Sequence, residues 1–384
     1  MPVCGVLMMR GHVYQRGKTW TYVIDLPRDP ITGKRRQKSK GGFKTEKEAW
    51  AACRNEIIRI ERGQNTQDEN MLYRDFLKIW LEEYAKSKLK PTTYENNKQI
   101  IDTRIIPELG NLKLRELTPL RIQRFYNKIL ATYSPDYVKT IHSVVSKTLR
   151  QAYKWDMLST NIMEKVDPPR VPKKEMKIWT LDQCQKFLET CKGHQMYIVF
   201  SLAIWTGMRR GEILGLRWKD IDLENKTISV QQTLSWTPTE GIIFQDTKTA
   251  RSNRSIVIPD ILLADLKTHK KLIAEQKIAN GNKYQDYGLV CCLTDGRPIK
   301  PRYLLEHFDD LIKKAGLPKI RFHDLRHTHA TLLIHLKVHP KIAAERLGQS
   351  TSMFTDRYAH VIESMQKEVA ASIDRAVNNL WIKS

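Results

Sequence analysis

The chain has 384 residues, of which 41% are hydrophobic, and it carries a formal net charge of +23 with an isoelectric point near 9.7. This length suggests two or three domains, and the positive charge favours a polyanionic partner, most simply a nucleic acid. An anionic membrane surface would also attract this charge, but no apolar run approaches the roughly 18 residues that a membrane-spanning helix needs. We therefore expect a cytoplasmic protein without membrane attachment.

The N-terminus and the cysteines are consistent with that compartment. Residues 1–9 are mildly apolar and too short for a secretory signal, and Met8 or Met9 could be the natural start. The cysteines include no Cys-x-x-Cys pair, which predicts reduced thiols in core or surface positions. The six cysteines are Cys4, Cys53, Cys184, Cys191, Cys291 and Cys292.

The first predicted domain, residues 1–64, begins with three strands. Residues 13–14 and 20–24 are rich in aromatic and β-branched types, which favour strands. A turn signal at residues 30–33 leads to residues 34–40, where Lys and Arg alternate with small polar residues as on a third, basic strand.

A helix is predicted to follow these strands. Thr45 and Glu48 have the spacing of a capping box, with Thr45 as the cap. Apolar residues then recur at helical spacing, which predicts a stripe that packs on the sheet. The stripe would consist of Ala49, Trp50, Ala52, Cys53, Ile57 and Ile60.

Residues 71–167 are predicted to form a helical domain after a polar linker at residues 63–70. Four helical segments follow one another, and three of them begin near Pro91, Pro119 and Pro135. The inward-facing residues of the first segment would be Leu72, Phe76, Ile79, Trp80 and Tyr84. Basic residues that could together neutralise phosphates are Lys86, Lys88, Lys90, Lys139, Lys147 and Arg150.

A proline-rich, basic linker at residues 168–174 predicts a domain boundary, and residues 175–384 would form the last domain. Its first helix would start at Thr180. The apolar run at residues 196–205 predicts a buried helix that ends at Gly207.

Arg209 follows this glycine, where a new helix would begin, and Glu212 lies three residues further on, where it could hold the guanidinium. Lys248 would lie in a hairpin turn between the last two of three predicted strands. These strands are residues 228–230, 242–244 and 255–258.

The stretch from His323 to Tyr358 contains the densest set of candidate functional residues. His323 and Arg326 are three apart and share one face of a helix, which suits a phosphate site because Arg can bind two oxygens at once. The opposite face would bury Leu325, Leu332, Leu333 and Leu336.

The same stretch contains His327 and His329, and three histidines so close together could suggest zinc. No carboxylate or Cys stands at ligand spacing to complete such a site, so we expect no metal. Beyond Tyr358, residues 365–382 are amphipathic at helical spacing, and this face would serve either core packing or the docking of a partner.

Three segments together resemble the tyrosine recombinase (phage integrase) family: Thr-Gly-Met-Arg-Arg-Gly-Glu at residues 206–212, Thr-Lys-Thr at residues 247–249, and the His323–Tyr358 stretch. The family pattern is an Arg after Thr-Gly, a Lys in a β-hairpin, His-x-x-Arg, a His or Trp after Leu-Gly, and a Tyr nucleophile. Gln stands where His or Trp is expected. The corresponding residues are Arg209, Lys248, His323, Arg326, Gln349 and Tyr358.

The resemblance implies a multidomain α+β fold. It comprises an arm-type DNA-binding domain with a three-stranded sheet plus helix, a helical core-binding domain, and a mainly α catalytic domain with a small antiparallel sheet. A basic sheet of this kind can place a strand in the major groove. A merely solvated basic hairpin is the alternative. The arm residues expected to contact DNA are Lys34, Arg35, Arg36, Lys38 and Lys40.

The resemblance also implies DNA strand exchange without a metal or other cofactor. Tyr358 would attack the scissile phosphorus and form a 3′-phosphotyrosyl link, while Arg209 and Arg326 neutralise the growing charge. Lys248 would protonate the departing 5′-oxygen, and His323 would accept or relay the tyrosine proton. Gln349 could still donate a hydrogen bond to the phosphate.

The expected assembly is a homotetramer on two double-stranded DNA attachment sites, and accessory DNA-bending or directionality proteins would be further partners. The arm domain suggests an integrase of a phage or integrative element, which integrates and excises that element. Three alternatives stay open. They are a topoisomerase-like nicking-closing enzyme, a DNA-binding regulator with a decayed catalytic domain, which Gln349 favours, and an RNA-binding protein, against which the lack of an RNP-type motif argues.

Overall fold

The computed structural model describes residues 10–26, 33–61, 70–172, 176–246 and 253–364, together with residues 370 and 374. The chain forms two compact units, Met1–Lys173 and Lys174–Ser384. The fold is α+β, as predicted, with a small N-terminal sheet, a helical core and further short antiparallel strands. Among the described residues, no helix is long and apolar enough to cross a membrane.

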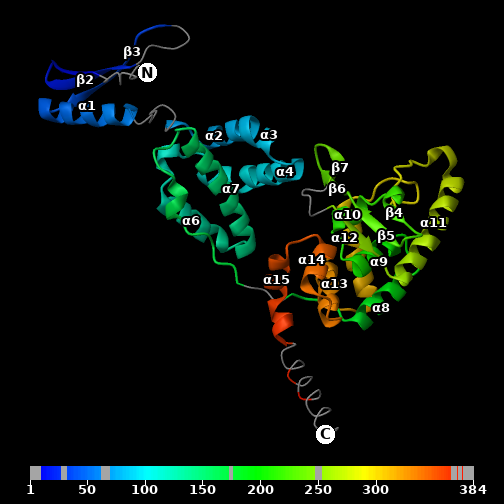
Figure 1. Ribbon diagram of the computed structural model, residues 1–384. Helices are drawn as coiled ribbons and strands as arrows, with labels where there is room; N and C mark the ends of the chain where they lie inside the picture. The colour runs from blue at the N-terminus through cyan, green and yellow to red at the C-terminus, as the bar shows by residue number, and fades with distance from the viewer. Residues whose placement is uncertain are drawn as a thin grey trace, which may run out of the picture. The chain divides into compact units, whose positions relative to one another are not determined.

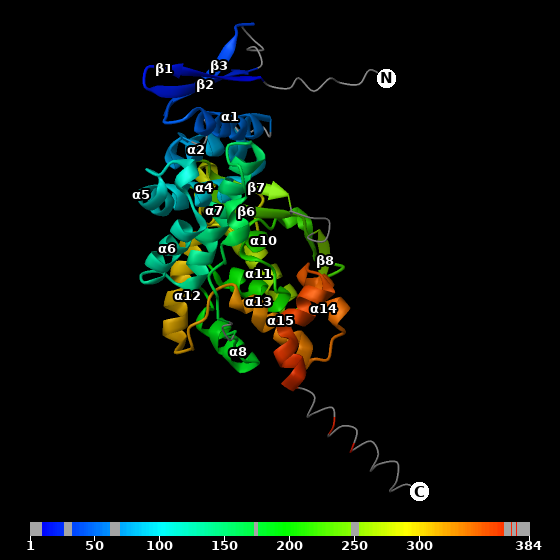
Figure 2. The same ribbon diagram turned by 90° about the vertical axis from the view of Figure 1, so that its left-hand side faces the viewer.

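The first unit begins with an antiparallel sheet in the order β1-β2-β3, and helix α1 packs against it (Figures 1 and 2). The bounds are Gly11–Arg16 for β1, Thr19–Leu26 for β2, Arg36–Phe43 for β3 and Glu46–Glu61 for α1. Their buried residues are Val13, Tyr22, Ile24, Ala49 and Cys53. The predicted three strands and helix are therefore confirmed, whereas most of the predicted turn at residues 30–33 lies outside the described residues.

The start of α1 carries the predicted cap. The Glu48 amide donates to Thr45 Oγ1 at 3.2 Å, and the Glu48 carboxylate in return accepts from the Lys44 amide at 3.1 Å. The prediction that Trp50 is part of the buried stripe is wrong, because its side chain is 37% exposed. Ala49, Cys53 and buried Glu56 recur at helical spacing and take the inward face, so Trp50 points away from it.

A helical bundle follows in the first unit (Figure 1). Its helices are α2 (Tyr73–Ile79), α3 (Lys86–Lys88), α4 (Pro91–Ile100), α5 (Ile106–Leu109), α6 (Pro119–Leu130) and α7 (Pro135–Lys154). Single π-helical turns, Trp80–Ala85 and Ile101–Ile105, connect α2 to α3 and α4 to α5. Short 3-10 turns span Leu114–Glu116 and Ile162–Lys165.

The first helix of this bundle corrects one predicted core residue. Ile79 is 38% exposed, whereas Leu77 and Leu81 are buried. Tyr73 is fully buried and fixes the inward face, from which Leu77 and Leu81 follow at four and eight residues. Position 79 lies six residues after Tyr73 and therefore faces outward.

The second unit contains the remaining elements. Its helices are α8 (Leu181–Thr190), α9 (Tyr197–Thr206), α10 (Arg210–Leu214), α11 (Asp260–Asn280), α12 (Pro301–Ala315), α13 (Asp324–His335), α14 (Pro340–Leu347) and α15 (Thr351–Ser364). Its strands are β4 (Ile221–Asp222), β5 (Thr227–Val230), β6 (Gln232–Thr237), β7 (Gly241–Asp246) and β8 (Arg254–Val257). Short 3-10 turns span Trp218–Asp220 and Gly281–Lys283.

The strands of the second unit form two antiparallel groups, β4-β5-β8 and β6-β7. Ser229 of β5 is opposite Ser255 of β8, whereas Leu234 of β6 is opposite Phe244 of β7. The predicted hairpin between β7 and β8 is therefore wrong, because each of these strands pairs with an earlier strand instead. Lys248, which that hairpin was predicted to carry, lies outside the described residues.

Helices α13, α14 and α15 pack against one another, and α14 also contacts β8 (Figures 1 and 2). Helix α13 is buried on most sides, including Asp324 and Arg326. Leu336 was predicted to be buried but is 63% exposed, because α13 ends at His335. The amphipathic segment at residues 365–382 lies outside the described residues apart from positions 370 and 374.

The described cysteines are free thiols in buried positions. These are Cys53, Cys184, Cys191, Cys291 and Cys292, whereas Cys4 lies outside the described residues. Burial raises the pKa of Cys184 and of Cys191 to about 12, so both thiols stay protonated at neutral pH.

Candidate active site

The turn after α9 brings Arg209 against α13 and α14. Gly207 ends α9 with a φ of 65°, and a Cβ at this position would lie 2.7 Å from side-chain carbons of both His329 and Leu347. Only glycine combines this conformation with such close packing. Arg209 then takes the N-cap position of α10 in an extended conformation.

Glu212 anchors two arginines at the start of α10. Its carboxylate is buried and accepts from the Arg209 backbone N–H at 2.9 Å and from Arg209 Nη1 at 2.8 Å. Arg254 Nη2 donates to the same carboxylate at 2.9 Å. Burial acts to raise the pKa of Glu212, but the two guanidiniums outweigh it and lower that pKa below its usual value. The predicted pairing of Glu212 with Arg209 is confirmed, and Arg254 is a second partner that the sequence did not reveal.

Arg326 lies beside Arg209 on the buried side of the site. Its Nη1 donates to the Gly207 carbonyl at 2.7 Å, and its Nη2 donates to the Leu347 carbonyl. Burial, followed by the charge of Arg209, lowers the pKa of Arg326 to about 9. Two cations held this close in a buried setting would be stabilised by an anion between them, which is typical of a phosphate site.

Three successive carbonyls at the end of α14 each accept from a different arginine, and we call them the carbonyl row. Arg254 Nε donates to the Arg346 oxygen at 2.8 Å, Arg326 to the Leu347 oxygen, and Arg209 Nη2 to the Gly348 oxygen at 3.1 Å. The last carbonyls of a helix lack intrahelical donors and lie at the negative end of its dipole, so cations are favourable there.

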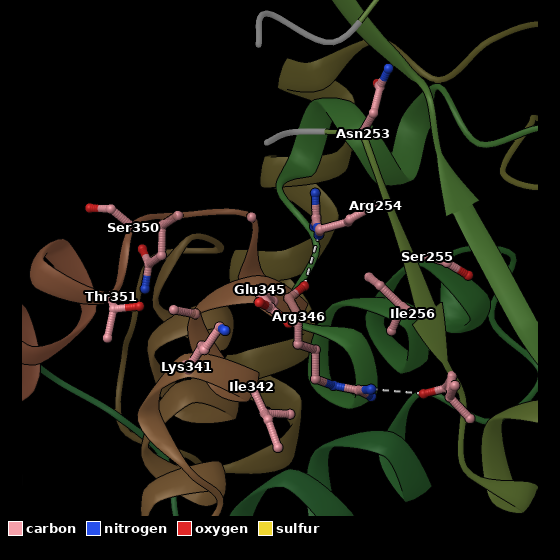
Figure 3. A pocket seen from close by; sticks show the side chains of 14 residues that line it. Asn253, Arg254, Ser255, Ile256, Lys341, Ile342, Glu345, Arg346, Ser350 and Thr351 are labelled. Carbon is pink, nitrogen blue, oxygen red and sulfur yellow. Dashed lines mark hydrogen bonds between the residues drawn. The ribbon is translucent and has the colours of Figure 1, made fainter. Parts of the chain in front are cut away.

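Arg346 fixes the end of α14 to three other elements. Its Nη1 donates to the Val257 carbonyl of β8 at 2.7 Å, and its Nη2 donates to the Trp205 carbonyl of α9 at 3.1 Å. Its Nε faces Nε2 of His329 on α13 at 3.1 Å. Figure 3 shows the Arg346 side chain extending from α14 towards β8, among the residues that line a pocket.

This pocket has a volume of about 740 Å³ and is lined by Arg254, Lys341, Gln349 and Ser350, among others (Figure 3). Gln349 is half-buried, and its Nε2 is buried without a hydrogen-bond acceptor among the residues that the structure describes. An amide donor without a protein acceptor can bond to an oxygen of a ligand. The position of Gln349, next to Gly348 of the carbonyl row, suits a phosphate oxygen.

Tyr358 lies on α15 where the helical dihedral angles are interrupted, with φ −109° and ψ 15°. Its side chain is only 1% exposed and packs against the ring of Phe354, with centroids 5.0 Å apart. Its hydroxyl is 2.7 Å from Nδ1 of His327. Burial raises the pKa of Tyr358 to about 12, although Arg326 and Arg357 act in the opposite direction.

His323 is exposed at the start of α13. Its ring stands perpendicular to that of His327, with centroids 5.1 Å apart. Partial desolvation, followed by the charge of Arg326, lowers the pKa of His323, so the ring is neutral at neutral pH. The hydroxyl of Tyr358 contacts the ring of His327 rather than that of His323.

The structure brings five predicted site residues into one region of the second unit. They are Arg209, His323, Arg326, Gln349 and Tyr358. Sequence reasoning missed Arg254 and the contact of His327 with Tyr358. The sequence signal for His327 is its place directly after Arg326, whereas its spacing from His323 and His329 suggested only a zinc set. Among the described residues, no group of three or more His, Cys, Asp or Glu side chains could hold a metal ion.

The basic residues of the N-terminal sheet lie in or just before β3, and most of them are exposed. They are Lys34, Arg35, Arg36, Lys38 and Lys40. Arg35 Nη2 is paired with Asp25 at 2.9 Å, and Lys38 Nζ lies 2.6 Å from Glu56. To bind a DNA phosphate, each of these two cations would therefore have to leave its carboxylate or contact the phosphate and the carboxylate together.

Three family models match the chain. The description "Phage integrase family" matches residues 177–365, "Phage integrase, N-terminal SAM-like domain" matches residues 72–130, and "Arm DNA-binding domain" matches residues 12–60. The site described above lies within the first of these matches.

Relatives resemble the chain over most of its length. A tyrosine recombinase XerC-like protein of Caldanaerobacter subterraneus subsp. tengcongensis is 30% identical over 359 residues, which cover 88% of this chain and 91% of that protein. The ICEBs1 integrase of Bacillus subtilis is 28% identical over 355 residues, which cover 90% of this chain and 94% of that integrase.

Solved structures share the fold. The Tn1549 transposon integrase, in complex with transposon right end DNA, aligns with a TM-score of 0.66 at 19% identity and covers 80% of this chain and 100% of that one. A lambda integrase tetramer bound to a Holliday junction aligns with a TM-score of 0.57 at 19% identity. The alignment covers 89% of this chain and 94% of the lambda integrase chain.

Proposed function

Because this chain belongs to the tyrosine recombinase (phage integrase) family and is a site-specific DNA recombinase, we propose that Tyr358 is its nucleophile and that Arg209 and Arg326 bind the scissile phosphate. The observation that supports this proposal is the pair of adjacent guanidiniums on the carbonyl row, beside the helix that carries Tyr358. The reaction would form a 3′-phosphotyrosyl link and release a 5′-hydroxyl.

The two arginines would act mainly on charge. As Tyr358 attacks, negative charge grows on the non-bridging oxygens, and preorganised cations in a partly buried site stabilise it strongly. Arg209 already donates to Glu212 and to the Gly348 carbonyl, and Arg326 already donates to the Gly207 and Leu347 carbonyls. Their remaining N–H groups can bind the phosphate without reorganising the side chains.

The remaining proposed roles belong to residues around this pair. Gln349 would donate its buried amide to a phosphate oxygen. His323, exposed at the start of α13, would contact the phosphate or relay a proton. Lys248 would protonate the departing 5′-oxygen, a role that rests on the family resemblance alone.

We further propose that the domains are residues 1–64, 71–167 and 175–384, with DNA bound by all three. The lambda integrase structure is a tetramer on a Holliday junction and the Tn1549 integrase structure contains transposon DNA, which supports a tetramer acting on two duplexes here. The biological reaction would be integration and excision of a mobile element, with accessory DNA-bending or directionality proteins as further partners.

The nucleophile is tested with a nicked suicide duplex made from the end of the element that encodes this protein. The parent protein should form a covalent adduct that shifts on a denaturing gel, and Tyr358→Phe should form none while binding the duplex with unchanged affinity. Tyr303→Phe is the matched control, because Tyr303 is a partly exposed tyrosine of the same unit. An adduct with the Tyr358→Phe protein would show that another residue is the nucleophile.

The arm domain is tested by deletion. A fragment beginning near Met71 should still cleave the core-type suicide duplex but fail at complete integration of a plasmid that carries the arm sites. Integration by this fragment at the parental rate would contradict the arm assignment.

A further inference from the structure

His327 is a buried histidine that the roles proposed so far do not use. Its side chain is 5% exposed, and Nδ1 lies 2.7 Å from the hydroxyl of Tyr358. The two rings are tilted by 61° with centroids 5.8 Å apart, so the contact is made through the edge of the imidazole. Within the part of the chain that the structure describes, the Tyr358 hydroxyl forms its hydrogen bond with His327 and with no other residue.

We propose that His327 is the general base that removes the proton of Tyr358 during DNA cleavage, a role that rests on the proposed function of Tyr358 as nucleophile. A general base must lie within hydrogen-bond reach of the proton that it abstracts, and His327 meets this condition. His323, which the sequence favoured for this proton, instead faces the ring of His327.

The proposed step moves one proton to His327 and exchanges one bond at phosphorus for another. The hydroxyl proton of Tyr358 passes to Nδ1 of His327, which must begin as the tautomer with its hydrogen on Nε2. The freed electron pair on the phenolic oxygen forms the new bond to phosphorus, the bond from phosphorus to the 5′-oxygen breaks, and that oxygen takes a proton from the general acid, for which we propose Lys248. His327 leaves the step as an imidazolium, and the same proton returns to Tyr358 on religation.

The charges around the pair fit this task. The groups that face His327 are His323 and Asp324 on its own helix, Arg321 before that helix, and Tyr358 and Arg357 on α15. Burial, followed by His323, lowers the pKa of His327 to about 4, so its lone pair is available at neutral pH.

Attack on phosphorus would bring the two groups closer in proton affinity. As the bond from the phenolic oxygen to phosphorus forms, that oxygen loses electron density and its proton becomes more acidic. Arg326 and Arg357 act in the same direction, because both lower the pKa of Tyr358. The proton transfer, which is unfavourable in the free protein, therefore becomes easier while the new bond forms.

Gln349 makes such a base more important in this chain. Where the family pattern has His or Trp, this chain has an amide that cannot titrate. Of the groups near Tyr358 that the structure describes, His327 is the one whose titratable nitrogen contacts the phenol.

The test compares His327→Asn with His323→Asn, and with the control His335→Asn, which changes an exposed histidine of the same helix, on the same suicide duplex in single-turnover cleavage. Asn keeps hydrogen-bonding capacity near the phenol but cannot accept a proton. We expect His327→Asn to cleave about 10²–10⁴-fold more slowly, the range for loss of a general base, with unchanged DNA affinity and an unchanged circular dichroism spectrum. His323→Asn should lose less.

A second measurement separates proton transfer from positioning. Replacing Tyr358 with a fluorinated tyrosine, inserted by nonsense suppression, gives a more acidic phenol that depends less on a base. The fluorinated residue should restore much of the rate lost in His327→Asn and little of any rate lost in His323→Asn.

Two outcomes would overturn the proposal. Cleavage by His327→Asn at or above the parental rate would mean that the contact only holds Tyr358 in its buried position. A slow variant that the fluorinated tyrosine does not restore would mean that His327 positions the ring without taking its proton. In either case Tyr358→Phe still tests the nucleophile independently, so the two failures are distinguishable.

Discussion

Acidification should destabilise the second unit through His329, which is locked in its neutral form. Its Nδ1 faces the Ile204 carbonyl oxygen at 2.9 Å, and its Nε2 faces Arg346 Nε at 3.1 Å. A carbonyl can only accept and a guanidinium can only donate, so the ring must carry its hydrogen on Nδ1 and keep a lone pair on Nε2. Burial, followed by the charge of Arg346, lowers the pKa of His329 from 6.5 to about 3.

The sign and size of the effect follow from these two values. Below about pH 6.5 the unfolded chain binds a proton at this residue, whereas the folded chain does not bind it until the pH falls to about 3. The free energy of unfolding therefore falls as the pH falls through this window. Between about pH 7 and pH 5, one such group removes about 2 kcal/mol.

Urea unfolding followed by tryptophan fluorescence at both pH values measures this loss. His329→Gln supplies a donor and an acceptor but does not titrate, so its unfolding free energy should depend on pH by about 2 kcal/mol less than that of the parent protein. His335→Gln is the control, because His335 is on the same helix but exposed. Equal pH dependence in the parent and in His329→Gln would refute the reasoning.

Three further predictions concern residues next to the arginines of the carbonyl row. Glu212→Gln should lower the free energy of unfolding by about 3–5 kcal/mol, because it removes the buried negative charge that pairs with both Arg209 and Arg254. A loss within the error of urea unfolding would contradict the anchoring role. Gly348→Ala should lower the melting temperature more than Gly241→Ala does. Both glycines have positive φ, but only at position 348 would a Cβ lie 2.9 Å from Arg254 Nη1, so equal falls in melting temperature would contradict the steric argument. Gln349→His should change single-turnover cleavage by less than about tenfold and Gln349→Ala should slow it by about tenfold to a thousandfold; an alanine variant as fast as the parent would mean that this side chain does not reach the phosphate.

Much of the fold was predictable because its signals are local. Prolines marked where helices begin, as at Pro119 and Pro135, and the hydroxyls of the preceding Thr118 and Ser134 accept from the first turns of α6 and α7. The buried run of α9 was evident from hydrophobicity alone. The strand pairing was not, because nothing local indicates that β8 pairs with β5 across the whole β6-β7 hairpin.

The candidate site divides in the same way. Short motifs identified Arg209, Arg326 and Tyr358, since each motif lies within a few residues. Arg254 and His327 acquire their importance only from contacts across long sequence separations, such as the bonds of Arg254 to Glu212 and to the Arg346 carbonyl. Such contacts depend on tertiary packing, which neither periodicity nor spacing encodes.

The carbonyl row has a consequence for how this enzyme can change over generations. The acceptors of the carbonyl row are main-chain atoms, so a substitution at Leu347 or Gln349 leaves all three of them in place. The side chain at position 349 can therefore vary, and the rate of cleavage with it, while the arginines that we propose to bind the phosphate stay in place. Gly348 is the exception, because its backbone conformation and its closeness to Arg254 admit no Cβ. We expect drift in this loop to adjust the speed of recombination far more readily than it abolishes binding of the phosphate.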